Sequence, residues 1–308
     1  MDENNSNIPQ DKDVSVQAGT QANRVRIGFV FLSVVPVAIL MAIQTLAQIP
    51  FLILAAVDVI SDANVSGSDL AYMDSIIMVF NDKYAAPMYL IYAVASITVF
   101  LIWYYRGFVR KNPRIKLGEI FGIRSVIASI CIAFGLYFFI NALLTLVSWI
   151  APDVIESYNQ MIETAGLTTN SVITIFYAVI LGPVAEELCF RGVVFEFLKK
   201  SGISPMWIIL ISSILFGAMH IIPVQVMYAT VIGLFLGFLR YKYRSVLLTL
   251  ATHILFNFTG TYISGIIDSL GLGDGVLMIL GGVAAIVLVV AVILVNGDKK
   301  AYKRVHNS

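Results

Sequence analysis

An apolar run at residues 171–198 contains three charged side chains. Glu186, Glu187 and Arg191 lie within six residues, and almost everything around them is hydrocarbon. A charge at membrane depth costs about 3 kcal/mol on insertion scales, so ionisable residues there indicate a functional site with partners on other helices. Glu187 and Arg191 are four apart with the acid first, the favoured order for an ion pair on one helical face. Glu186 points about 100° away and needs a partner on another helix.

Two histidines in other apolar runs are candidate partners for Glu186. His220 lies near the end of one run, one turn after Phe216, and His253 lies one turn before Asn257 in another. A carboxylate and an imidazole can activate water, and a second imidazole and an amide can donate to a developing oxyanion. The same groups could instead bind a divalent metal. Both arrangements fit hydrolysis of an amide bond at membrane depth.

These residues also have a purely structural interpretation. A single histidine or asparagine inside a membrane is often only an interhelical hydrogen bond, and Glu187 with Arg191 could be only a structural ion pair. The combination of all three runs favours chemistry. Other protease motifs are lacking, since the sequence contains no H-E-x-x-H zinc pair. Residues 271–274 read G-x-G-D, but they lie in a predicted loop without an intramembrane aspartate to pair with.

The composition predicts an all-α polytopic membrane protein. Hydrophobic residues make up 59% and charged residues 13% of the 308 residues, whereas soluble domains carry about 25% charged residues. The mean hydropathy is +0.88. Because the backbone must satisfy its own hydrogen bonds in lipid, apolar runs of about 20 residues are expected to be helices. Cys131 and Cys189 both lie in such runs, so we expect no structural disulfide.

About eight transmembrane helices are expected, separated by loops. Their predicted positions are residues 27–47 with a kink or interfacial continuation to 60, then 85–105, 126–150, 171–198, 205–222, 225–239, 245–267 and 276–295. Basic loops alternate with acidic or neutral loops such as 61–83 and 153–163, so the positive-inside rule places both termini in the cytoplasm. We expect a disordered cytoplasmic tail at 1–23, a transmembrane domain at 24–298 and a basic cytoplasmic tail at 299–308. Gly233 and Gly237 predict a close helix contact.

Together, the three sets of polar residues resemble the motifs of a known family, the CAAX prenyl protease and bacteriocin-processing (CPBP or Abi) intramembrane proteases. The order and spacing agree for Glu186-Glu187-x-x-x-Arg191, Phe216-x-x-x-His220 and His253-x-x-x-Asn257. The resemblance covers about residues 171–262, under a third of the chain. Each motif alone is weak, but all three in order, each in an apolar run, are specific.

The resemblance implies a fold of about eight spans with a catalytic cavity between spans four, five and seven. It implies that Glu186 is the base that activates water, assisted by His220. It further implies that His253 and Asn257 stabilise the oxyanion.

The remaining motif residues, Glu187, Arg191 and Phe216, would then be supporting residues. The family is commonly described as metalloproteases. If a divalent metal such as zinc is bound, Glu186, His220 and His253 are the expected ligands. A glutamate and histidine mechanism without metal fits the same residues.

The expected activity is that of an intramembrane endopeptidase acting on a membrane-associated protein or peptide in a bacterial plasma membrane. The resemblance implies a role in bacteriocin self-immunity or peptide maturation. The alternative is a non-catalytic scaffold or regulator that binds a sensor or a cell-wall enzyme. A transporter is disfavoured because no inverted repeat is found, and no nucleic-acid partner is expected.

Overall fold

A computed structural model describes residues 25–62, 69–110, 120–164 and 171–298. Within these ranges every element is helical and no strand occurs, so the all-α prediction is confirmed. The predicted tails at 1–23 and 299–308 lie outside the described residues. The first part of the chain forms α1 (Ile27–Leu32), α2 (Val34–Ser61), α3 (Asp69–Val79), η1 (Phe80–Tyr84), α4 (Ala85–Tyr104), η2 (Tyr105–Val109), α6 (Ile123–Ile150) and α7 (Pro152–Thr164).

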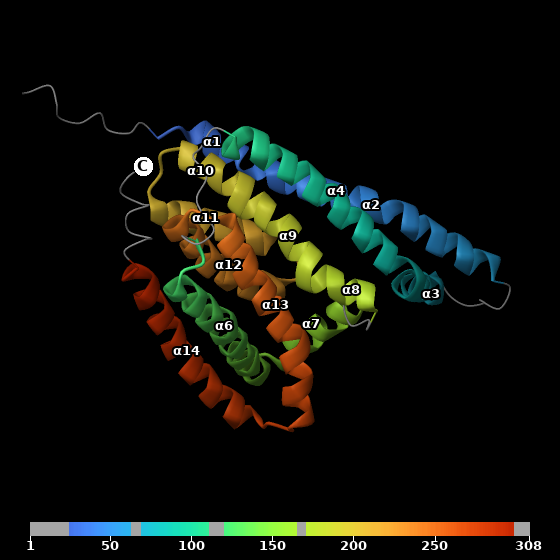
Figure 1. Ribbon diagram of the computed structural model, residues 1–308. Coiled ribbons are helices and arrows are strands. Elements are labelled where there is room, and N and C mark those ends of the chain that lie inside the picture. The colour runs from blue at the N-terminus through green and yellow to red at the C-terminus, as the bar shows by residue number, and fades with distance from the viewer. Residues whose placement is uncertain (1–24, 63–68, 111–119, 165–170, 299–308) are drawn as a thin grey trace, which may run out of the picture.

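The second part of the chain carries the motifs. Its elements are α8 (Val172–Phe176), η3 (Tyr177–Leu181), α9 (Gly182–Glu187), η4 (Leu188–Val194), α10 (Phe195–Lys200), α11 (Pro205–Ala218), α12 (Pro223–Tyr243), α13 (Val246–Ser269) and α14 (Asp274–Asn296). The elements labelled η are π-helical turns, and η3 and η4 make α8 to α10 one continuous helix. Figure 1 shows this helix running beside α4.

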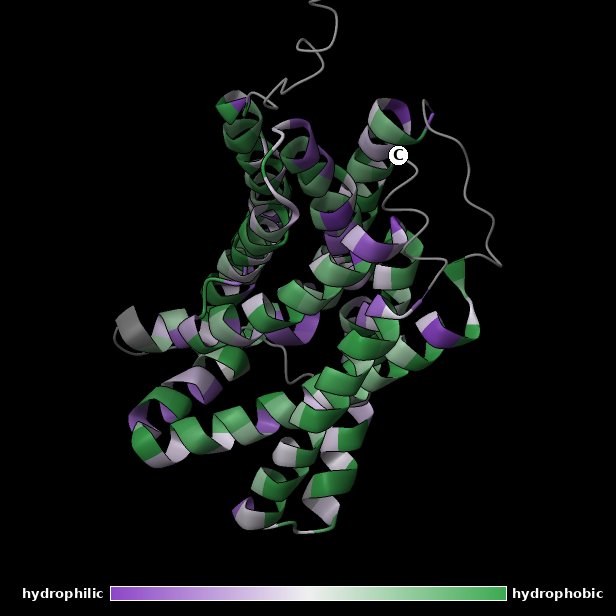
Figure 2. Ribbon diagram, turned by 90° about the vertical axis from the view of Figure 1, so that its left-hand side faces the viewer, coloured by the Kyte–Doolittle hydropathy of each residue, from purple (hydrophilic) through white to green (hydrophobic). Residues whose placement is uncertain are grey.

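Among the described residues, seven helical runs are long and apolar enough to cross a membrane. The chain is therefore a multi-pass membrane protein, and seven of the eight predicted spans have sufficient length. The exception is the predicted fifth span, where α11 has only 14 residues. At 1.5 Å per residue it is about 21 Å long, shorter than the hydrocarbon core of about 30 Å. Figure 2 shows hydrophobic residues along the lengths of the helices.

The predicted boundaries of the first helix and of the two acidic loops differ in part from the structure. The first helix does not end near residue 47 but continues through Pro50 to Ser61, in agreement with the expected continuation to residue 60. Membrane helices tolerate an internal proline when neighbouring groups satisfy the freed backbone. Residues 69–83 of one expected acidic loop and all of the other, 153–163, are also helical, as α3 with η1 and as α7. In α7, Pro152 occupies the first helical position and Asp153 the first turn, both favourable there.

The basic ends of the helices gather at one end of the molecule. The contacts that connect them are Arg26 N to Ser201 O at 2.8 Å, the Lys200 amine over the Phe108 ring at 4.5 Å, Arg124 to Gly297 O, and the Tyr243 hydroxyl to Asp298 at 3.0 Å. Figure 1 shows α1, α10 and the end of α14 on this side. These contacts place the described ends of the predicted basic connections side by side.

The predicted close contact at Gly233 and Gly237 is confirmed as packing of α12 against α11. A Cβ atom at Gly233 would lie 3.0 Å from the backbone of Ser213, and one at Gly237 would lie 3.2 Å from Ile209. The absence of a side chain at residue 233 brings the α12 backbone close to neighbouring helices. This approach matters for the site, because the Gly233 carbonyl contacts Arg191.

Candidate active site

The helix that carries the first motif is interrupted by π turns on both sides of the two glutamates. Pro183 explains the first turn, since proline has no N–H and its ring clashes with a regular α-helical neighbour one turn earlier. The N–H of Gly182 donates to the carbonyl of Tyr177, five residues earlier. A Cβ at Gly182 would lie 3.2 Å from that oxygen, so glycine suits this wide turn.

Asn257 completes the backbone hydrogen bonding of this π turn. The carbonyl of Ala178 has no donor one turn later, because Gly182 donates to Tyr177 and Pro183 has no N–H. The Asn257 side-chain amide on α13 donates to Ala178 O at 2.8 Å. One of the two amide hydrogens of Asn257 is therefore engaged in a structural role, and the other remains available to a ligand.

Glu187 and Arg191 form a fully buried ion pair. Their Oε1 and Nη1 atoms are 3.0 Å apart, and both side chains have 0% exposure. Arg191 also donates from Nη2 to Gly233 O at 3.3 Å, and its guanidinium lies 4.4 Å from the centre of the Phe216 ring. These contacts come from α11 and α12, so Arg191 connects the motif helix to both neighbours while it neutralises Glu187.

His253 on α13 lies between the two glutamates. Its Nδ1 is 3.1 Å from Glu187 Oε1 and its Nε2 is 3.7 Å from Glu186 Oε2. A carboxylate only accepts hydrogen bonds, so Nδ1 carries the hydrogen and Nε2 faces Glu186. Glu187 fixes the orientation of the imidazole, as a carboxylate does in hydrolytic triads. Glu186 is the more accessible carboxylate, with 16% exposure against 0% for Glu187.

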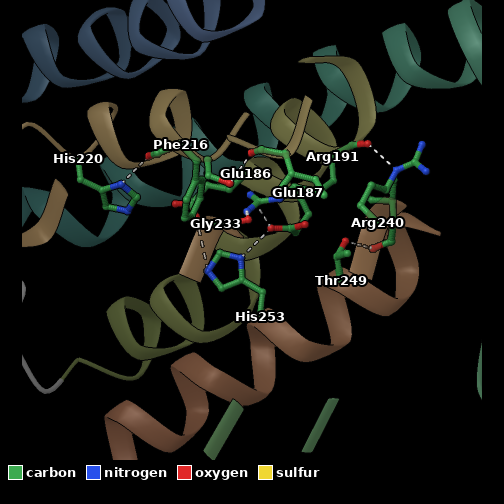
Figure 3. A network of polar contacts seen from close by, with 12 residues as sticks. Glu186, Glu187, Arg191, Phe216, His220, Gly233, Arg240, Thr249 and His253 are labelled. Carbon is green, nitrogen blue, oxygen red and sulfur yellow. Dashed lines mark hydrogen bonds and ion pairs between the residues drawn. The ribbon is translucent and has the colours of Figure 1, made fainter. Parts of the chain in front are cut away.

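Phe216 separates the two histidines. Its ring centre is 5.2 Å from that of His220 and 5.7 Å from that of His253, both in edge-on arrangements. Nδ1 of His220 lies 3.0 Å from the carbonyl of Phe216 and donates to it, which leaves Nε2 free for another contact. Figure 3 shows His220 and His253 on either side of Phe216, with Glu186 close by.

His220 lies just beyond the end of α11, in a strained turn. The following residue, Ile221, has a φ of +65° and its side chain is exposed. A β-branched residue rarely adopts a positive φ, and such strain is concentrated at functional sites. Within the described part of the chain, no hydrogen bond or ion pair joins His220 to Glu186.

The segment that contains all these motif positions matches a known family. Residues 168–259 match the family model of type II CAAX prenyl endopeptidases, described as Rce1-like. The resemblance to the CAAX protease family is confirmed over this segment. The comparisons with curated proteins and with solved structures found no match. The match supports an intramembrane protease of CAAX type that acts on membrane-associated peptide substrates.

The structure adds contacts between the CAAX protease motifs that the sequence did not specify. The resemblance implied a supporting role for Glu187, and Glu187 is the direct hydrogen-bond partner of His253. Asn257 contacts the backbone of the motif helix rather than a second catalytic side chain. Arg240 on α12 was not anticipated, although it donates to the carbonyl of Arg191 at 2.8 Å. The sequence showed only a cation directly after the predicted span 225–239, and cations are common at the ends of such spans.

The expected metal ligands of the CAAX protease motifs do not form a metal cluster. The described residues contain no group of three or more His, Cys, Asp or Glu side chains that could hold a metal ion. Nδ1 of His220 contacts a main-chain carbonyl and Nδ1 of His253 contacts Glu187, contacts that metal-ligating histidines also make through the nitrogen that does not bind the metal. A divalent metal at Glu186, His220 and His253 therefore stays a prediction, and the reaction proposed for the site uses its side chains alone.

Proposed function

We propose that this chain is an intramembrane endopeptidase in which Glu186 activates the attacking water. The position of His253 between the two glutamates is the observation that supports this most directly. Glu187 orients Nδ1 of the imidazole and Arg191 neutralises Glu187, so the more accessible Glu186 is the carboxylate left to accept a proton. A carboxylate and an imidazole held together in an apolar environment suit general acid–base chemistry.

In the proposed reaction, Glu186 takes a proton from water as the water oxygen attacks the carbonyl carbon of the scissile peptide bond. The oxyanion accepts hydrogen bonds from the free amide hydrogen of Asn257 and from Nε2 of His253, which carries a hydrogen in the imidazolium form of the ring. The ring enters the reaction with both hydrogens and keeps them throughout. Glu186 then gives its proton to the leaving amine as the C–N bond breaks. His220, whose Nε2 is free, assists in holding the water.

The proposed substrate is a membrane-associated protein or peptide, cleaved at membrane depth. The matched family supports this substrate class. We further propose, from the motif resemblance, a bacterial setting with a role in peptide maturation or self-immunity to a bacteriocin. The gathering of basic helix ends at one end of the molecule supports placing both termini in the cytoplasm.

The test compares the protein termini of membrane and secreted fractions from cells that express wild type or Glu186→Gln. The amide keeps the shape of the side chain but cannot act as a base, so cleavage should fall at least about 100-fold. Glu156→Gln, which changes an exposed carboxyl group on α7, is the matched control and should cleave like wild type. Identical termini in all strains, together with a phenotype that Glu186→Gln still rescues, would reject the protease and support the scaffold.

A further inference from the structure

A buried arginine outside the three motifs contacts the motif helix just beyond the glutamates. Arg240 lies in the last turn of α12 and its side chain is only 3% exposed. Its Nε donates to the main-chain carbonyl of Arg191 at 2.8 Å. The same guanidinium forms an ion pair with Glu196 and lies 5.2 Å from the centre of the Phe195 ring. Figure 3 shows it approaching the Arg191 backbone from the side opposite the histidines.

The carbonyl that Arg240 contacts belongs to a wide helical turn. Arg191 lies within the π turn η4, where the regular α-helical hydrogen-bond ladder is altered. A π turn can relax toward the α-helical winding, which would rotate every side chain on one side of it. Arg240 contacts Arg191 within the turn and Glu196 after it. Because its planar guanidinium binds both groups at once, it fixes the local winding of the helix, which the single ammonium group of a lysine would not do.

Arg191 is held at both ends by one face of α12. The Gly233 carbonyl accepts from its guanidinium, and Arg240 donates to its backbone. Positions 233 and 240 are seven residues apart, about two helical turns, and so lie on the same face. The side chain of Arg191 then contacts Glu187, and Glu187 contacts His253. A continuous series of polar contacts thus runs from Glu196 to the proposed reacting pair.

We propose that Arg240 is a positioning residue that holds Arg191, and through it Glu187 and His253, in the reactive arrangement. This inference rests on the proposed protease function for its kinetic consequence. The arginine touches neither the imidazole nor Glu186, so it acts only through the geometry of the motif helix.

The experiment compares Arg240→Gln, Arg240→Lys and Lys242→Gln in the full chain purified in detergent. Lys242 is the matched control, because it is another cation in the last turn of α12 and its amine lies over Phe238. Arg240→Gln should lower kcat by up to about 100-fold, because a misplacement of about 1 Å at a reacting group can cost that much, with KM little changed. Arg240→Lys should retain part of the activity, and Lys242→Gln should behave as wild type.

A second measurement does not depend on activity. Nitrogen NMR of histidine-labelled protein reports the hydrogen bond of His253 Nδ1, and its resonance should move in Arg240→Gln but not in Lys242→Gln. An unchanged resonance and an unchanged pH profile of kcat/KM, with only a lower melting temperature, would overturn the positioning role. An equal loss in Lys242→Gln would also overturn it, by assigning the effect to charge. If the resonance moves while wild type is as inactive as Glu186→Gln, the protease proposal fails and the positioning of His253 stands.

Discussion

At the scale of single residues, Glu187 is the carboxylate on which the arrangement depends. It is fully buried, pairs with Arg191 and accepts from His253. Removing one member of a buried ion pair leaves an uncompensated charge, whereas removing both can be nearly neutral. The stability and the chemistry of the site should therefore respond differently to single and double substitutions of this pair.

We predict that Arg191→Gln lowers the free energy of unfolding by about 3–5 kcal/mol, because Glu187 is left charged and buried. The double variant Glu187→Gln with Arg191→Gln should recover much of this loss yet remain inactive, because a neutral amide at position 187 cannot orient His253 as a carboxylate does. Denaturant unfolding in detergent micelles measures the first effect, and peptide cleavage measures the second. A double variant no more stable than Arg191→Gln alone would contradict the explanation.

The sequence predicted the Glu187–Arg191 pair correctly because the two residues share one helix, where spacing determines which side chains meet. It did not predict that Glu187 contacts His253, because that contact joins two helices. Which side chains meet across an interface depends on the rotation and axial position of each helix. Hydrophobic periodicity is weak in helices that are apolar on every side, so these quantities could not be derived from it.

At the scale of the elements, Pro183 and Asn257 form one structural unit although α13 and the motif helix are far apart in the sequence. The proline removes a backbone donor and the asparagine supplies one to Ala178. A carbonyl without a donor inside the membrane lowers stability by about 1–3 kcal/mol. The two residues should consequently show coupling in a double-mutant cycle.

We predict that Asn257→Ala lowers the free energy of unfolding by about 1–3 kcal/mol in wild type, and by less in a Pro183→Ala background. In that background the new N–H at residue 183 can donate to the helix, so the amide is less needed. Thermal unfolding of the four proteins of the cycle measures the coupling. Strictly additive effects would show that Asn257 does not substitute for the missing backbone donor. Both Asn257→Ala variants should still lose activity, since the proposed oxyanion donor is gone.

The helices themselves were predictable where an apolar run coincided with a span, as for α6 and α14. The sequence missed α7 because a helix with one polar face is not a long apolar run. The hydroxyl groups of Tyr158 on α7 and Tyr228 on α12 are 3.4 Å apart, a tertiary contact that no local sequence pattern indicates. The π turns were also missed, although Pro183 was a local signal for the first of them.

At the scale of the whole molecule, the orientation in the membrane is open to direct measurement. We predict that Arg110→Cys and Lys200→Cys react with a membrane-impermeant thiol reagent only from the cytoplasmic side, because the basic helix ends lie together. Ser269→Cys, at the opposite end of α13, should react only from outside. Cys131 and Cys189 would first be replaced by serine and alanine. Labelling of Arg110→Cys and Ser269→Cys from the same side would contradict this topology.

The short length of α11 has a consequence for how water reaches the proposed site of hydrolysis. It is about 9 Å shorter than a hydrocarbon core of about 30 Å, and His220 lies two residues beyond its last residue, Ala218. Backbone that is not helical is tolerated at such depth only where protein surrounds it or water reaches it. We therefore expect hydration to extend inward from the opposite membrane face to His220. The water that hydrolyses a peptide bond surrounded by lipid would then reach the site past the end of α11.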